Sequence, residues 1–116
     1  MNVLPQADNV VIPIEKFTKY ALDPVDDYDK HIAFKRALGY TLDNYQDLID
    51  NIRANIKNFN AKPKADDGHG LRYEVIMELT GANGKTAFVL TAWIDDKTKG
   101  EMRLINAYVD KRKGKP

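Results

Sequence analysis

The polar side chains best suited to chemistry lie within an apolar stretch toward the C-terminal end of the chain. Residues 85–94 read K-T-A-F-V-L-T-A-W-I and residues 102–108 read M-R-L-I-N-A-Y. Both alternate at period two, which predicts strands with two different faces. In the second strand the alternation assigns Met102, Leu104, Asn106 and Tyr108 to one face and Arg103, Ile105, Ala107 and Val109 to the other. Side chains that can donate protons or bind phosphate therefore lie among apolar residues of a strand. We expect the functional site to lie at this strand.

Three further candidates lie outside these strands. Lys30 stands one helical turn before an apolar stripe that begins at Phe34. It is either a lysine whose stem packs at the edge of the core or a functional amine. His31 falls beside the same stripe, as a boundary residue or a catalytic base. His69 stands between two glycines and is either catalytic or simply exposed.

The composition excludes several familiar kinds of active site. The chain has no serine and no cysteine, which excludes a serine nucleophile, a disulfide framework and a cysteine-ligated metal. With two separated histidines and no calcium-loop spacing among the carboxylates of 23–29, we expect no metal and no other cofactor. The remaining Lys, Arg, Thr, Asn, Tyr and His side chains suit metal-free phosphodiester cleavage. That reaction needs a base for the ribose 2′-proton, an acid for the leaving oxygen and cations for the phosphate.

Length and charge set further limits. We expect one globular domain over residues 1–110 and a basic flexible tail at 111–116, because a chain of 116 residues can bury one real core. A net charge of +1 argues against a dedicated duplex binder, so any nucleic-acid binding has to be local. No apolar run approaches the roughly 20 residues that span a bilayer, and we expect a soluble protein without a membrane span. The candidate substrate-binding cations are Lys62, Lys64, Arg72 and Lys85.

The order of elements predicts an α+β fold. Apolar residues at helical spacing predict three helices, over 13–21, 27–38 and 44–58. Residues 60–70 are rich in turn formers and predict a polar loop. Strands are expected over 72–80, 85–94 and 102–109, with a hairpin turn at Asn83-Gly84. We therefore expect N-terminal helices packed on a three- to four-stranded antiparallel meander.

Several segments resemble a known type of bacterial domain. They are L-P-Q-A-D-N-V-V-I-P-I-E-K-F at 4–17, D-K-H-I-A-F-K-R-A-L-G-Y at 29–40, R-Y-E-V at 72–75, G-A-N-G-K-T-A at 81–87, and T-A-W-I with R-L-I-N-A-Y at 91–94 and 103–108. They resemble a small uncharacterised domain that recurs at the C-termini of polymorphic and contact-dependent inhibition toxins and also as a free-standing protein. Its layout is similar to that of the barnase, EndoU, colicin and RelE group of ribonuclease toxins, a likeness of fold alone.

The resemblance implies a set of catalytic residues. In such toxins the active site lies on the open face of the sheet beside a helix, where Lys or His, Arg, Thr or Ser, and Tyr act. Carried over, these are Lys30, Thr91 of T-x-W, and Arg103 and Tyr108 of the last strand, with His31 as a further candidate. We expect the first four to converge on one cleft. Before A-Y, where threonine is expected, this chain has Asn106, so an amide replaces a hydroxyl.

Two functions of different classes follow. The resemblance implies a metal-independent RNA endonuclease that leaves 2′,3′-cyclic phosphate ends, as a transfer-RNA-directed effector domain of an interbacterial toxin. Its partners would be RNA and a cognate immunity protein, and it would act in the bacterial cytoplasm of the target cell after delivery. The alternative is a non-catalytic module that binds protein or serves as an accessory of a toxin or phage locus. The near-neutral charge mildly favours the alternative.

Overall fold

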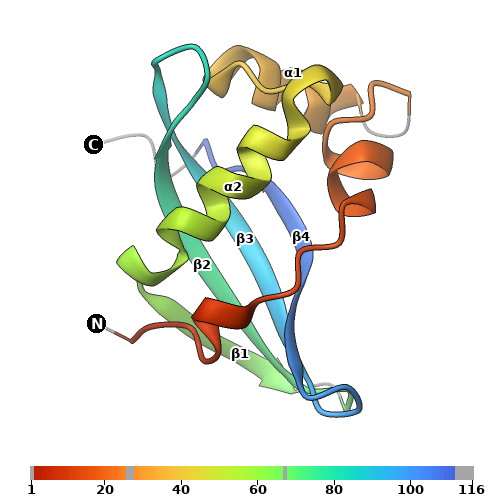
Figure 1. The fold of residues 1–116 in the computed structure, drawn as a ribbon, viewed down its shortest axis with the longest axis vertical. Helices are drawn as coiled ribbons and strands as arrows, with labels where there is room; N and C mark the ends of the chain where they lie inside the picture. Colours follow the sequence, from red (N-terminus) through yellow and green to blue (C-terminus); the bar gives the residue numbers. More distant parts are fainter. Residues whose placement is uncertain (1, 26–27, 67, 112–116) are drawn as a thin grey trace.

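Helices precede a sheet in this chain, and they pack on it. The structure, a computed structural model, describes residues 2–25, 28–66 and 68–111, with the backbone alone at Tyr28. Figure 1 shows the four antiparallel strands in the order β1-β2-β3-β4, with α2 crossing in front of them. The predicted α+β arrangement is confirmed. The predicted basic tail, apart from Lys111, lies outside the described residues.

The two α-helices form where the sequence has helical spacing. α1 spans Tyr28–Leu38 and gives way to Gly39, whose φ of 76° is a left-handed conformation that glycine adopts without strain. The predicted start of this helix at Asp27 lies outside the described residues. α2 spans Tyr45–Asn55 and continues as a 3₁₀ turn over Ile56–Asn58, in agreement with the predicted helix at 44–58.

The helix predicted at 13–21 forms in part, as a short helical segment over residues 15–21. The N-terminal segment forms a 3₁₀ turn over Ala7–Asn9 and a single π-helical turn over Phe17–Ala21. Phe17 and Ala21 are buried as expected, but Ile14 is 44% exposed. A helix this short is only marginally stable by itself, so the tertiary contacts of Phe17 decide the local conformation.

The sheet has one strand more than the three that the sequence marks clearly. The strands are β1 (Ala61–Asp66), β2 (Leu71–Thr80), β3 (Thr86–Asp96) and β4 (Glu101–Val109). The prediction of a loop over 60–70 is wrong at β1, where Ala61 pairs with Val75 and Lys62 with Glu74. Pro63 is compatible with this strand because β1 lies at the edge of the sheet, where a missing N–H breaks no ladder.

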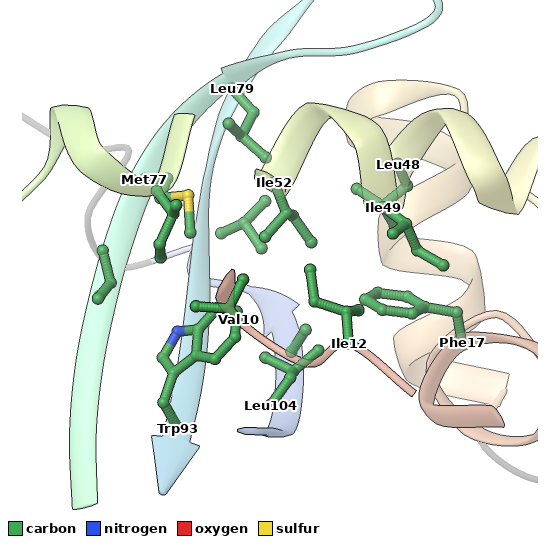
Figure 2. Close-up of a cluster of buried hydrophobic side chains, with 14 of the residues drawn as sticks. Val10, Ile12, Phe17, Leu48, Ile49, Ile52, Met77, Leu79, Trp93 and Leu104 are labelled. Atoms are coloured by element: carbon green, nitrogen blue, oxygen red, sulfur yellow. The ribbon is translucent and has the colours of Figure 1, made fainter. Parts of the chain in front are cut away.

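The hydrophobic core lies between one face of the sheet and the helical layer. Figure 2 shows Ile52 of α2 directed toward Met77 and Leu79 of β2, with Trp93 of β3 below them. The N-terminal segment adds Val10, Ile12 and Phe17 to the same cluster, and α1 packs against β3 and β4. The other face of the sheet is called the open face below. It presents Glu74 and Ile76 of β2, Phe88, Leu90 and Ala92 of β3, and Arg103, Asn106 and Tyr108 of β4.

An irregularity in β4 decides which of its side chains reach the open face. Ala92 of β3 lies opposite Asn106, but the next residue, Trp93, lies opposite Leu104, so Ile105 is an extra residue in β4. This is the geometry of a β-bulge, which reverses the alternation of side chains beyond it. The predicted face assignment is therefore wrong after Leu104. Asn106 and Tyr108 leave the core face of Leu104 and join Arg103 on the open face.

A substitution of Ile52 tests whether α2 is anchored through its buried apolar residues, Leu48, Ile49 and Ile52. The side chain of Ile52 is fully buried, so Ile52→Ala should lower the free energy of unfolding by about 2–5 kcal/mol through lost burial and the cavity left behind. Chemical denaturation followed by circular dichroism measures this loss. Gln46→Ala, on the exposed side of the same helix, is the matched control and should change stability by no more than about 0.5 kcal/mol. Equal effects of the two substitutions would contradict this packing.

Candidate functional site

Three of the residues selected from the sequence meet at the outer edge of β4. The Nζ atom of Lys30 on α1 donates a hydrogen bond of 2.7 Å to Oδ1 of Asn106. The same Nζ lies 5.9 Å from the ring centroid of Tyr108, within the range of a cation–π contact. Lys30 and Asn106 are 76 positions apart in the sequence, so the tertiary fold creates this cluster.

The bulge fixes the geometry of Asn106. Its Oδ1 also accepts a 2.9 Å hydrogen bond from the backbone N–H of Ala107, so one amide oxygen receives two donors. These two bonds assign the oxygen of the side-chain amide and leave its Nδ2 amino group directed elsewhere. Within the described residues, Nδ2 of Asn106 and the hydroxyl of Tyr108 have no hydrogen-bond partner. Both groups can therefore donate to a ligand.

The cluster lines a cavity, and its hydrogen-bond donors suit an anionic ligand. Lys30, Asn106 and Tyr108 border a space of about 350 Å³, at the lower end of the usual size of ligand pockets. An ammonium, an amide N–H and a phenolic O–H all supply protons to a negatively charged oxygen. Asp29, Ala33, Val109 and Lys111 complete the lining. Asp29 brings a carboxylate that the sequence does not single out, because the carboxylates of 23–29 follow no recognised ligand spacing.

The position of Lys30 depends on how α1 is held against the sheet. Phe34 and Leu38, one and two turns after Lys30, are fully buried and tie the helix to the core. At the end of α1, the N–H of Asn83 in the β2–β3 turn donates to the carbonyl of Leu38 at 3.3 Å. A Cβ on Gly81 would collide with that same carbonyl, so only glycine permits this approach. The hairpin and the buried stripe together direct Lys30 to the edge of β4.

Thr91 does not belong to this site. Its side chain is fully buried on the core face of β3, where Oγ1 donates to the carbonyl of Val75 and accepts from Nε1 of Trp93, each at 2.8 Å. The expectation that Thr91 shares a cleft with Lys30 is therefore wrong. The hydroxyl instead satisfies a buried tryptophan N–H, which would otherwise be costly to bury. The signal was present in the sequence, since period two places Thr91 on the face of Val89 and Trp93.

Arg103 and the two histidines lie apart from the cluster. Arg103 is on the open face, three residues or about 10 Å along β4 from Asn106, and its Nη2 pairs with Glu101 at 3.2 Å. His31 is half-buried on α1 and does not border the cavity of Lys30. His69 is exposed in the connection between β1 and β2. The structure thus joins Lys30 with Tyr108 and Asn106, and it separates Arg103 and His31 from them.

Comparison with known proteins identifies the domain. A family model described as a domain of unknown function (DUF6883) matches residues 3–111. The chain belongs to this family. Comparisons with curated proteins and with solved structures find no match. Membership of DUF6883 names no activity, so the function of the domain has to be argued from its geometry.

Three of the four predicted substrate-binding cations of this DUF6883 domain lie around the open face. Lys62 and Lys64 project from the edge strand β1 and are exposed, and Lys64 lies 3.6 Å from Glu74. Arg72, at the start of β2, borders a cavity of about 450 Å³ together with Lys64. Lys85 is exposed beside the β2–β3 turn and borders none of the cavities lined by these residues.

Two other properties of the DUF6883 domain concern the described part of the chain. No helix there is long and apolar enough to cross a membrane. In the same part, no three acidic or histidine side chains gather as a metal site would require. A third property concerns Asp66 in β1, whose carboxylate accepts hydrogen bonds from the N–H of Gly68 and from Lys97. The backbone N–H of Gly68 and the nearby Lys97 hold the pKa of that carboxyl below its ordinary value.

Thr91 offers a test that separates a structural from a catalytic role. Thr91→Val keeps the shape but leaves the Nε1 proton of Trp93 without an acceptor, so it should lower the free energy of unfolding by about 1–3 kcal/mol. Denaturant unfolding of this variant is compared with that of Thr86→Val, an exposed threonine at the start of the same strand, where little change is expected. A Thr91→Val protein with unchanged stability would contradict the structural role.

Proposed function

We propose that this DUF6883 domain is a metal-independent RNA endonuclease. The observation that supports the proposal best is the convergence of Lys30, Asn106 and Tyr108 on one cavity at the margin of the open face. Three donors of different acidity around one space match the needs of a phosphodiester whose charge rises during cleavage. Asp29 supplies the acceptor that such a set otherwise lacks.

The proposed reaction uses the ribose of the substrate as its own nucleophile. The 2′-oxygen attacks the adjacent phosphorus, the bond from phosphorus to the 5′-oxygen breaks, and the products are a 2′,3′-cyclic phosphate and a 5′-hydroxyl. Lys30 and Nδ2 of Asn106 stabilise the added charge on the phosphoryl oxygens. The carboxylate of Asp29 accepts the 2′-proton, and the hydroxyl of Tyr108 gives its proton to the leaving 5′-oxygen.

The biological setting is also part of the proposal. We propose that the substrate is transfer RNA, that the domain acts as the effector of an interbacterial toxin in the cytoplasm of the target cell, and that an immunity protein neutralises it in the producer. The segments that resemble toxin-associated domains, such as D-K-H-I-A-F-K-R-A-L-G-Y at 29–40, support this setting. One of them carries Lys30 and Asp29, and another carries Asn106 and Tyr108.

The decisive experiment is incubation of the purified domain with total transfer RNA in the presence of EDTA. The wild type should give discrete products that end in 2′,3′-cyclic phosphate. Lys30→Ala should lower kcat/KM on the order of 10²–10³-fold, because one preorganised electrostatic contact to the transition state is lost. Lys35→Ala, which removes an exposed lysine from the same helix, is the matched control and should retain full activity. Intact RNA at a large excess of wild-type protein would favour the non-catalytic module instead.

Tyr108→Phe tests the proposed acid separately from the packing of the ring. It removes only the hydroxyl, so the thermal midpoint should stay close to that of the wild type while kcat falls by about 10²–10⁴-fold. Rates are measured on an RNA with a single cleavable linkage. A Tyr108→Phe enzyme as active as the wild type would remove Tyr108 from the reaction.

A further inference from the structure

A groove leads away from the proposed site across the open face. Tyr108 borders the cavity of Lys30 on one side and a second space of about 580 Å³ on the other. The second space reaches the opposite edge of the sheet at Lys62 and Lys64. Glu74, Ile76 and Leu90 line it between these ends, and Asp110 lines it just after β4. Tyr108 therefore lines both cavities, which lie next to each other.

Strand register arranges the groove as two parallel rows of side chains. In the first row Lys62 lies opposite Glu74, Glu74 opposite Ala92, and Ala92 opposite Asn106, whose Oδ1 binds Lys30. In the second row Ile76 lies opposite Leu90, and Leu90 opposite Tyr108. The first row therefore has an ammonium group at each end. The second has Leu90 buried at its centre, between the partly exposed side chains of Ile76 and Tyr108.

The distance between the two cationic ends is too large for a single phosphate. Three strand spacings separate β1 from β4, which is about 14 Å. A ligand that contacts both Lys30 and the Lys62–Lys64 pair must therefore carry at least two separated anionic groups. An extended polynucleotide has such groups, and its bases would lie over the second row.

We propose that this groove binds single-stranded RNA across the strands, with Lys62 and Lys64 holding a phosphate remote from the one that reacts beside Lys30. The inference rests on the proposed function for the identity of the reacting phosphate. Only unpaired bases expose the faces that can pack on the partly exposed side chains of Ile76 and Tyr108. A duplex would present phosphates alone to a domain whose net charge is +1, which gives little affinity.

The carboxylates in the groove agree with this orientation. Glu74 lies between the two cationic ends, where it disfavours a phosphate and can accept hydrogen bonds from the amino groups of bases. Asp110 is buried just after β4, where its carboxylate likewise disfavours a phosphate. Glu74 also lies 3.6 Å from the Nζ of Lys64, so Lys64 is positioned at the rim. Phosphates are therefore directed to the ends of the groove and bases to its middle.

Binding is tested first with a substrate that cannot react. A fluorescent hexanucleotide of 2′-O-methyl RNA lacks the attacking hydroxyl, and fluorescence anisotropy measures its Kd over a series of salt concentrations. The double variant Lys62→Ala/Lys64→Ala should bind roughly tenfold more weakly, the equivalent of one charge-assisted hydrogen bond. For this variant, the slope of the logarithm of the association constant against the logarithm of the salt concentration should be shallower by about 0.7, the value for one phosphate contact to a single strand.

The matched control is Lys35→Ala/Lys99→Ala, which removes the same charge from two exposed positions away from the groove. It should leave the Kd within about twofold and the slope unchanged, since distant exposed charges are screened. Equal weakening by both double variants would reduce the effect to net charge and overturn the proposal. Binding of an RNA duplex as tight as that of the single strand would overturn it as well. So would failure of the wild type to bind either RNA, which would leave the groove to a protein partner.

Cleavage rates connect the groove with the reaction and keep the two proposals apart. The ratio of kcat/KM for a hexanucleotide to that for a dinucleotide should fall about tenfold in the Lys62→Ala/Lys64→Ala variant, because only the longer RNA reaches β1. An unchanged ratio would overturn the remote phosphate site while the nuclease stands. If no RNA is cleaved but the binding results hold, the groove stands and the nuclease is overturned.

Discussion

The extra residue in β4 is the constraint on which the candidate site depends. Without the bulge, with Ile105 paired as a regular strand residue, strict alternation would turn Asn106 and Tyr108 into the hydrophobic core and Ala107 out to the open face. With it, the first half of β4 contributes Met102 and Leu104 to the core, and the second half offers an amide and a phenol to the open face. Because of this irregularity, one part of β4 packs in the core and the next part lines the candidate site.

The position of Lys30 depends on contacts in a different part of the fold. The helix that carries it is fixed by the buried side chains of Phe34 and Leu38 and by the close approach of its last turn to Gly81. Residues remote from the cavity therefore set the direction of the ammonium group. Changes at Gly81 would shift Lys30 relative to Asn106 without touching either residue, and a shift of about 1 Å would be enough to disturb the proposed catalysis.

Sequence reasoning succeeded where the determining forces are local. Apolar residues at helical spacing, Ile52 among them, are sufficient to predict α2. The turn residues Asn83-Gly84 are sufficient to predict the β2–β3 hairpin. It failed at β1, whose Pro63 and lysines resemble a loop until β2 supplies a partner strand. It also failed at the bulge, which is a property of two strands in register and not of one. Lys30 and Tyr108 were selected by resemblance, but their contact follows only from the tertiary fold.

The edges of the sheet restrict how any protein partner can dock. Pro63 interrupts the row of N–H donors along the outer side of β1, and the lysines beside it oppose the close approach of another strand. At the opposite edge, the backbone of Val11 already bonds to Met102 and Leu104. Neither margin is a free template for strand addition. A binding protein would have to recognise side chains, and one seated on the open face would occupy the surface that we propose for RNA.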